Sequence, residues 1–161
     1  MKKFLIFLVL FSLIFFTYKS QYNDNFYYIF DKIEGVEFCY VFSQDNQEKC
    51  VNYVNKNQNN EFRTIKTGGH QFIYFKDLVY FNVLANYKQA TFFGDENLDK
   101  IKSCINYIKV FEENIQNIDI EYGYCPQLSK FVIVNDNKIN IQIAKISNKI
   151  TVGHPMIYGS Y

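Results

Sequence analysis

A short apolar segment at the N-terminus is the feature that most constrains this chain. Two lysines precede an almost unbroken apolar run from Phe4 to Thr17, and polar sequence has returned by Ser20. A basic start, a short apolar stretch and a small residue at the boundary are typical of secretory signal peptides. The run is shorter than the roughly 20 apolar residues that cross a bilayer. We therefore predict a signal peptide over 1–20 and a single secreted domain over 21–161.

The alternative is an N-terminal segment that is never cleaved. Cleavage after Ser20 would leave Tyr18 at a position where signal peptidases prefer a small residue. In a retained segment, Tyr18 and Lys19 would lie among the lipid headgroups. The protein would then be an anchored accessory subunit of an organelle membrane complex, and a membrane is a partner only in that case.

Charge argues against nucleic acid as a partner. The chain has Lys+Arg 17 and Asp+Glu 16, a formal net charge of +1, whereas nucleic-acid binding needs a strongly basic face. Arg63 is the only arginine, so bidentate clamps for phosphate or carboxylate groups are scarce.

Four cysteines, at positions 39, 50, 104 and 125, follow the predicted signal peptide. An even number in a secreted chain predicts two disulfide bonds, for which three pairings exist. We favour Cys39–Cys50 and Cys104–Cys125, the pairs nearest in sequence. A closed loop of about 15 residues adds roughly 3 kcal/mol of stability in the chain-entropy model. Zinc would require closely spaced ligand pairs, and the sequence has no C-x-x-C and no histidine pair. We expect no metal and no other cofactor.

Most of the predicted domain reads as β-strand, because apolar segments rich in β-branched and aromatic residues alternate with turn residues. The predicted strands are Val36–Phe42, Lys49–Val54, Glu61–Lys66, Gln71–Lys76, Leu78–Leu84, Gln89–Phe93, Lys130–Val134, Lys138–Ile143 and Ile150–Val152. The first two predict a hairpin that would bring Cys39 and Cys50 together. Asn135 to Asn137 has the chemistry of a hairpin turn that tolerates positive φ.

One helix is predicted near 97–116. Its apolar residues recur at steps of three and four, which is the pattern of one buried helix face. They are Leu98, Ile101, Ile105, Ile108, Phe111 and Ile115. Asp95 or Asn97 is the expected N-cap. The fold class is therefore α+β, mainly antiparallel β in hairpins or Greek-key-like units, with this helix covering one sheet face.

Part of the chain resembles βγ-crystallin Greek-key units. Val36–Val51 and Leu78–Phe93 align as a weak internal repeat with matching apolar positions. Ala85 to Thr91 resembles the folded hairpin of such a unit, and Ile105 to Val110 resembles its closing strand. The resemblance covers about 36–110 and implies that 105–110 is a strand, in conflict with the helical pattern.

The resemblance does not extend to the functional residues of that family. Gln89 replaces the glycine of the folded hairpin, and residues 102–105 (KSCI) lack the paired Asn/Asp of the family's calcium-binding segment. No calcium site is therefore implied.

Asp95, Asn97 and Asp99 form D-x-N-x-D, like the opening of a calcium loop. Lys100 replaces the loop glycine and Asn106 replaces its final glutamate, which excludes an EF-hand. Acidic residues at a helix N-terminus account for the same pattern through the helix dipole.

The remaining candidate catalytic residues are few. His70 and His154 are the only histidines, and no Ser or Cys lies in a nucleophile motif. Glu112 and Glu113 would point apart on a helix and could not act as a carboxylate pair. We therefore predict that the protein is not an enzyme.

The sequence favours a non-enzymatic structural or binding protein of the secretory pathway, either granule cargo or an extracellular coat component. Its partner would be another protein or a second copy of the chain. A carrier of an apolar ligand such as a lipid is the other alternative, with aromatic side chains lining the cavity. Those side chains are Phe72, Tyr74, Tyr80, Phe92 and Phe93.

Overall fold

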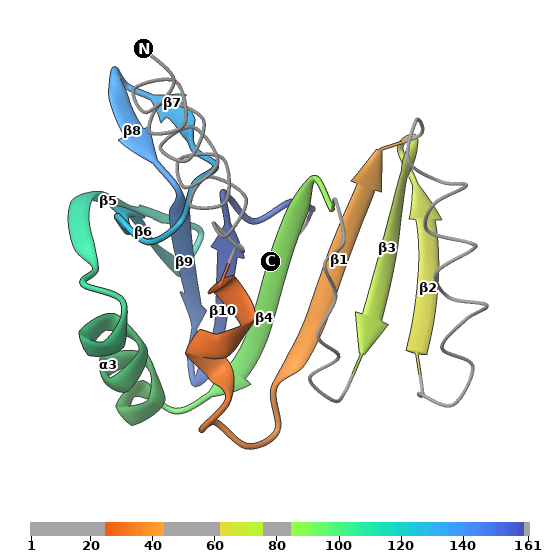
Figure 1. The fold of residues 1–161 in the computed structure, drawn as a ribbon, viewed down its shortest axis with the longest axis horizontal. Helices are drawn as coiled ribbons and strands as arrows, with labels where there is room; N and C mark the ends of the chain where they lie inside the picture. The colour runs from red at the N-terminus through yellow and green to blue at the C-terminus, as the bar shows by residue number, and fades with distance from the viewer. Residues whose placement is uncertain (1–24, 44–61, 76–84, 160–161) are drawn as a thin grey trace, which may run out of the picture.

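One antiparallel sheet organises the molecule (Figure 1). The computed structural model describes residues 25–43, 62–75 and 85–159. In chain order the elements are η1 (Asn25–Phe30), β1 (Glu37–Ser43), β2 (Phe62–Thr67), β3 (His70–Phe75), β4 (Tyr87–Phe93), α3 (Asp95–Cys104), β5 (Ile108–Ile115), β6 (Ile118–Tyr124), β7 (Val132–Val134), β8 (Asn137–Ile139), β9 (Ile141–Ile146) and β10 (Lys149–His154).

Eight of these strands form the main sheet, in the order β2-β3-β1-β4-β10-β9-β6-β5, and β7 and β8 form a separate two-stranded sheet. Every neighbouring pair is antiparallel. The fold class predicted from the sequence, mainly antiparallel β with one helix, is confirmed for the described part of the chain.

The largest core lies on the face of the sheet that η1 and α3 cover (Figure 1). Phe26 and Phe30 of η1 pack edge-on at 5.2 Å between ring centroids, and Phe30 contacts Phe92 of β4. Leu98 and Ile101 bring α3 onto the same core. Fully burying such side chains stabilises the fold by about 1.5–3 kcal/mol each.

The opposite face carries two smaller apolar clusters. One surrounds Ile120 and Tyr122 beneath the β7–β8 hairpin, and the other surrounds Val41 and Phe72. The C-terminal segment packs on both, since Ile157 joins the first cluster and Tyr158 the second. Because both faces are covered, β1 is a nearly continuous buried run instead of an alternating one.

The predicted helix is wrong in its second half. The α-helix ends at Cys104, and Asn106 then adopts a φ of 50°, a left-handed conformation that commonly follows a helix C-terminus. The segment after it is β5, which pairs with β6 through a two-residue turn in which Gln116 and Asn117 both have positive φ. Such turns match the twist of antiparallel strands. The hairpin therefore overrides the helical spacing of Ile108, Phe111 and Ile115.

The other predicted elements fall into three groups. Strands near 61–66, 71–76, 89–93 and 150–152 are confirmed, and so is the turn at Asn135 and Asp136, where φ is 48° and 61°. The predicted strand 138–143 is divided into β8 and β9 at Asn140. The strands predicted at 49–54 and 78–84 lie outside the described residues. The predicted hairpin between 36–42 and 49–54 is wrong, because β3 and β4 occupy both sides of β1.

The N-cap prediction is wrong. Gly94, with a φ of 92°, precedes α3, and no side chain caps the first turn. Asp95 and Glu96 instead occupy that turn, where the helix dipole favours negative charge. Asn97 donates through Nδ2 to the Phe93 carbonyl at 3.0 Å, which ties the helix start to β4.

Alanine substitution at two isoleucines tests where the helix ends. Ile101 in α3 is 1% exposed and Ile108 in β5 is 53% exposed. We predict that Ile101→Ala lowers the free energy of unfolding by about 2–5 kcal/mol and Ile108→Ala by less than about 1 kcal/mol. Urea denaturation measures both. Equal losses would contradict the strand assignment and favour a continuous helix with both residues on its buried face.

Candidate functional site

An open cleft lies between α3 and the end of the sheet formed by β5, β6 and β9. It has a volume of about 780 Å³. The cleft exists because α3 packs over the core and leaves the outer part of the β5–β6 hairpin uncovered. Most of its lining residues are charged: Asp95, Asp99, Glu112, Glu113, Asp119, Glu121 and Lys145. Glu113 borders the cleft through β5, but its side chain lies on the other face, where it accepts a hydrogen bond from the Tyr122 hydroxyl.

Cross-strand pairing sets the carboxylates of the sheet side by side. Glu112 lies directly opposite Glu121, and Asp119 lies opposite Lys145 of β9. Like charges in opposite positions repel, so each carboxylate depends on a neighbouring donor. Lys109 forms an ion pair with Glu112, and Asn114 donates to Asp119 at 2.7 Å.

Glu121 has the most enclosed position of the group. Lys102 reaches from α3 and donates to both of its carboxylate oxygens, at 2.8 and 2.9 Å, and both side chains are about three-quarters buried. The Tyr107 hydroxyl donates to the same carboxylate at 3.4 Å. Burial, followed by the Glu121 charge and this hydrogen bond, raises the pKa of Tyr107 well above its usual range.

Gly123 makes the position of Tyr107 possible. A Cβ at residue 123 would come within 2.0 Å of the Tyr107 ring, so the ring lies directly on the backbone of β6. The glycine therefore places the Tyr107 hydroxyl beside Glu121, two residues earlier on the same strand.

A second ion pair joins the helix to the sheet. Lys145 of β9 contacts Asp95 at 2.6 Å, at the start of α3. Asp99 is the one cleft carboxylate for which the described structure shows neither a hydrogen bond nor an ion pair. The cleft therefore keeps a negative charge that Lys102, Lys109 and Lys145 do not fully neutralise.

The three residues of the D-x-N-x-D pattern, Asp95, Asn97 and Asp99, therefore have different roles. Asp95 and Asp99 line the cleft, whereas Asn97 contacts the backbone of β4. Within the described residues, no three His, Cys, Asp or Glu side chains come together in a way that could hold a metal ion.

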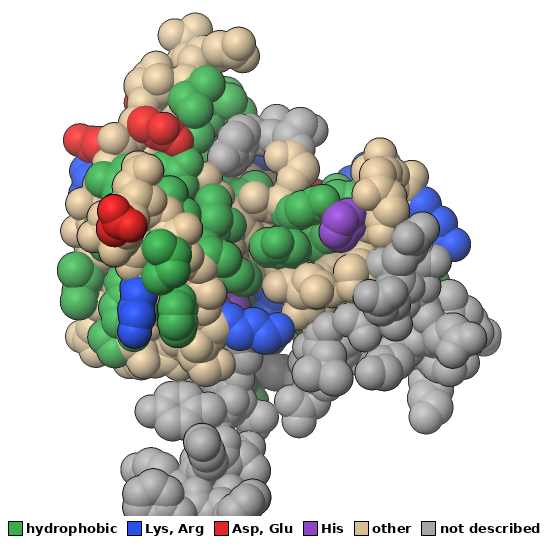
Figure 2. Space-filling view, turned by 90° about the horizontal axis from the view of Figure 1, so that it is seen from above, with side chains coloured by type: hydrophobic (Ala, Val, Ile, Leu, Met, Phe, Trp, Pro, Cys, Tyr) green, Lys and Arg blue, Asp and Glu red, His purple; other side chains and the backbone are tan. Residues whose placement is uncertain are grey.

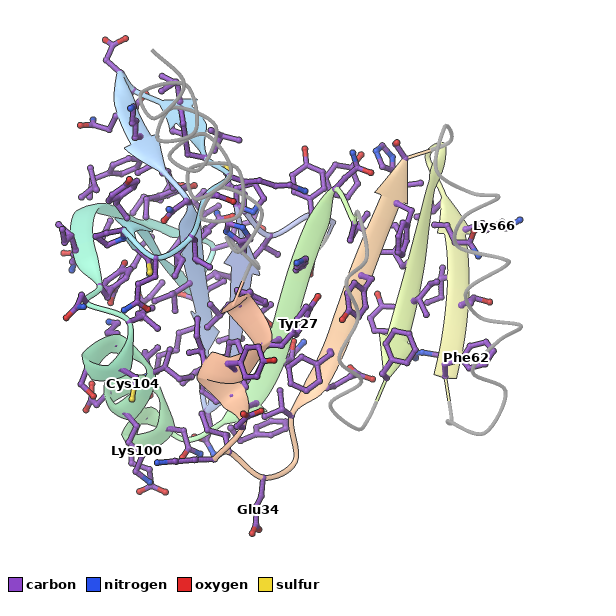
Figure 3. The ribbon with its side chains drawn as sticks, in the orientation of Figure 1. Tyr27, Glu34, Phe62, Lys66, Lys100 and Cys104 are labelled. Carbon is purple, nitrogen blue, oxygen red and sulfur yellow. The ribbon has the colours of Figure 1, made fainter. Side chains whose placement is uncertain are left out.

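The cysteines do not form the predicted Cys104–Cys125 bond. Cys104 is exposed at the end of α3 (Figure 3), whereas Cys125 is buried and donates from Sγ to the Ile105 carbonyl at 3.1 Å. Asn140 holds the backbone of Cys125 on both sides, accepting from its N–H and donating to its carbonyl at 2.7 Å each. Position 125 is thereby fixed in the core, away from the helix surface.

Cys39 is also a free, buried thiol, and its predicted partner Cys50 lies outside the described residues. Burial raises the pKa of Cys39 to about 12, with a partly opposing hydrogen bond from Tyr74. Cys39 is therefore a neutral thiol at physiological pH.

The two histidines lie on opposite faces of the sheet. His154 is buried, stacks on Phe26 at 5.7 Å and contacts the Asn140 carbonyl through Nδ1 at 2.7 Å. His70 contacts the Tyr158 hydroxyl at 2.9 Å on the other face. They do not form a catalytic pair. Glu112 and Glu113 also point to opposite faces, as expected, although they lie on a strand and not on a helix.

The aromatic side chains proposed to line a lipid cavity are not brought together. Phe72 and Tyr74 pack on the face of Val41, Phe92 is buried in the core beneath η1, and Phe93 is 61% exposed. Tyr80 lies outside the described residues. No helix among the described residues has the length and apolar content needed to cross a membrane.

The sheet side of the cleft was not predicted from the sequence. Asp119, Glu121 and Lys145 lie on strands β6 and β9, and residues 118–124 were not predicted as a strand. The alternation Ile118-Asp119-Ile120-Glu121-Tyr122 is the signal that identifies β6. Comparison of the chain with known protein families, with curated proteins and with solved structures finds no match.

Chemical labelling tests the state of the thiols. We predict that iodoacetamide modifies Cys104 in the native protein without prior reduction, while Cys39 and Cys125 react only after unfolding, because the thiolate is the reactive form and both thiols are buried. Mass spectrometry of proteolytic fragments locates the label. Labelling of Cys104 only after reduction would show that this residue is in a disulfide bond.

Proposed function

We propose that the protein is a non-enzymatic binding or structural protein of the secretory pathway, granule cargo or an extracellular coat component, and that its acidic cleft binds a basic segment of a partner protein. The observation that carries the proposal is the cleft itself. It combines a volume of about 780 Å³ with carboxylates from α3, β5 and β6.

The carboxylates are placed to recognise charge. Lys102 of α3 pairs with Glu121 of β6, and Lys145 of β9 pairs with Asp95 of α3. These two ion pairs connect the helix to the sheet along one side of the cleft. Asp99 remains available on the exposed side of α3 for the ammonium or guanidinium group of a partner. Complementary charge raises association rates and selects among partners more than it raises affinity. The expected interaction is therefore fast, salt-sensitive and moderate in strength.

The same geometry supports binding in preference to catalysis. The cleft carboxylates whose partners are described are held in ion pairs or hydrogen bonds, and both histidines lie elsewhere. A lipid carrier is supported less well, because the aromatic residues proposed for it face different sides of the sheet.

A lysine-rich peptide titrated against the protein tests the cleft. We predict that Asp99→Asn weakens binding by about fivefold, the effect of losing one exposed ion pair. The affinity of the unmodified protein should fall as salt is raised, because exposed charges are screened within about 10 Å at 0.1 M. Isothermal titration calorimetry at two salt concentrations measures both effects.

Asp136→Asn is the matched control, since it removes the same charge from the β7–β8 turn, away from the cleft. This variant should bind the peptide as the unmodified protein does. Equal weakening by both variants would mean that only net charge matters, and an affinity unchanged in Asp99→Asn would remove the cleft from the proposal.

A further inference from the structure

The two ends of the sheet are the feature that the proposed function leaves unused. β2 forms one end and β5 the other, and no described residue pairs with the outer side of either strand. Figure 1 shows them at opposite ends of the molecule. The outward backbone N–H and C=O groups of an end strand are a template for pairing with another strand.

Because the number of strands is even, the β2 end of one copy can pair antiparallel with the β5 end of another. Eight strands alternate in direction across the sheet, so the first and last strands, β2 and β5, run in opposite directions. If a second copy is moved sideways along the sheet, its β2 comes to lie antiparallel to the β5 of the first. The faces also match, because the copy is not turned over and its helix-covered face stays on the same side.

The charges of the two end strands are complementary. β2 carries Arg63 and Lys66 and no acidic residue, whereas β5 carries Glu112 and Glu113 with Lys109 as its one base. Figure 2 shows most of the visible acidic side chains on one half of the molecule, whereas basic side chains lie on both halves, including the far end of the other. Phe62 and Lys66, labelled in Figure 3, mark the β2 end.

A row of directly paired residues shows which side chains share a face. It crosses the sheet through Arg63, Tyr74, Cys39, Gln89, Gly153, Gln142, Tyr122 and Phe111. Arg63 and Phe111 therefore lie on one face. Since residues two apart on a strand also share a face, Ile65 and Glu113 lie there too.

One antiparallel register uses all four of these residues. It places Arg63 of one copy opposite Glu113 of the next and Ile65 opposite Phe111, giving one ion pair and one apolar pair. Arg63 pairs with Glu37 at 3.7 Å and lies over the Tyr74 ring, but its side chain is still 63% exposed. Ile65 is 41% exposed, so both side chains can be reached by a second copy. The β-bulge between Lys109 and Phe111 ends the regular part of β5, which limits pairing to Phe111–Ile115.

We propose that copies of this chain associate edge to edge, with β5 of one copy pairing with β2 of the next. The contact uses different surfaces on the two copies and does not close on itself, so it generates an open assembly. This inference goes beyond the proposed binding function and does not depend on it, because the assembly needs no peptide in the cleft.

Charge reversal at the two ends tests the proposal. We predict that the full chain assembles as its concentration rises, in sedimentation velocity at low salt without peptide. Arg63→Glu or Glu113→Arg alone should raise the concentration needed by about tenfold, because an attractive cross-strand pair becomes a repulsive one. An equimolar mixture of the two variants should assemble like the unmodified protein, since every junction between unlike variants has opposite charges.

Matched controls carry the same charge changes away from both ends. Lys100→Glu on α3 and Glu34→Lys before β1 project from another part of the surface (Figure 3) and should not change assembly. Circular dichroism establishes that each variant is folded, and Arg63→Gln, which removes the charge without reversing it, replaces Arg63→Glu if the latter unfolds.

Three results would overturn the proposal. The first is an unmodified chain that stays monomeric at all concentrations. The second is an end-strand variant that assembles as readily as its control. The third is a mixture of folded variants that fails to regain assembly.

Discussion

The pairing of β4 with β10 is the interaction on which the rest of the structure depends. It joins β1, β2 and β3 to β5, β6 and β9, and without it the sheet would separate into two four-stranded parts (Figure 1). Thr91 and Thr151 share a hydrogen bond of 3.1 Å across this junction. The C-terminal segment reinforces it, because Gln89 of β4 donates to the Tyr158 carbonyl at 2.8 Å and Gln142 of β9 accepts from the Ile157 N–H at 2.9 Å.

Small residues at this junction allow both faces to be covered. Ala90 lies beneath the aromatic side chains of η1 and is fully buried. On the opposite face, a Cβ at Gly153 would come within 2.4 Å of the Ile157 nitrogen, so the C-terminal segment can lie directly on the sheet only because residue 153 is glycine. The fold can therefore cover the centre of its sheet while leaving the β5 end to form the acidic cleft.

The sequence was most informative where local chemistry and tertiary pairing agree. The strand from Gln89 to Phe93 and the Asn135-Asp136 turn were predictable because β propensity and positive-φ tolerance act locally. The strand at 108–115 was not, because its apolar spacing suits a helix and only its pairing with β6 decides the outcome. The Cys104–Cys125 pairing failed for a related reason, since distance in sequence does not show that Asn140 holds Cys125 in the core.

Only the helix side of the candidate site could be predicted from the sequence. Asp95 and Asp99 stood out as a local acidic pattern, and the structure places both in the cleft. Glu121 and Lys145 come from strands far along the chain, and they meet the helix only because β9 and β6 pair in a particular register. A non-local site of this kind requires the sheet order, which the local hairpins did not determine.

Hydrogen exchange directly measures the stability of the β4–β10 junction. Backbone amides in 87–93 and 149–154 should be among the slowest to exchange and should open together, because separating this pair of strands disrupts the whole sheet. Mass spectrometry of quenched proteolytic fragments measures both segments in one experiment. Rapid exchange in either segment, while β1 and β9 remain protected, would show that the two halves do not form one sheet.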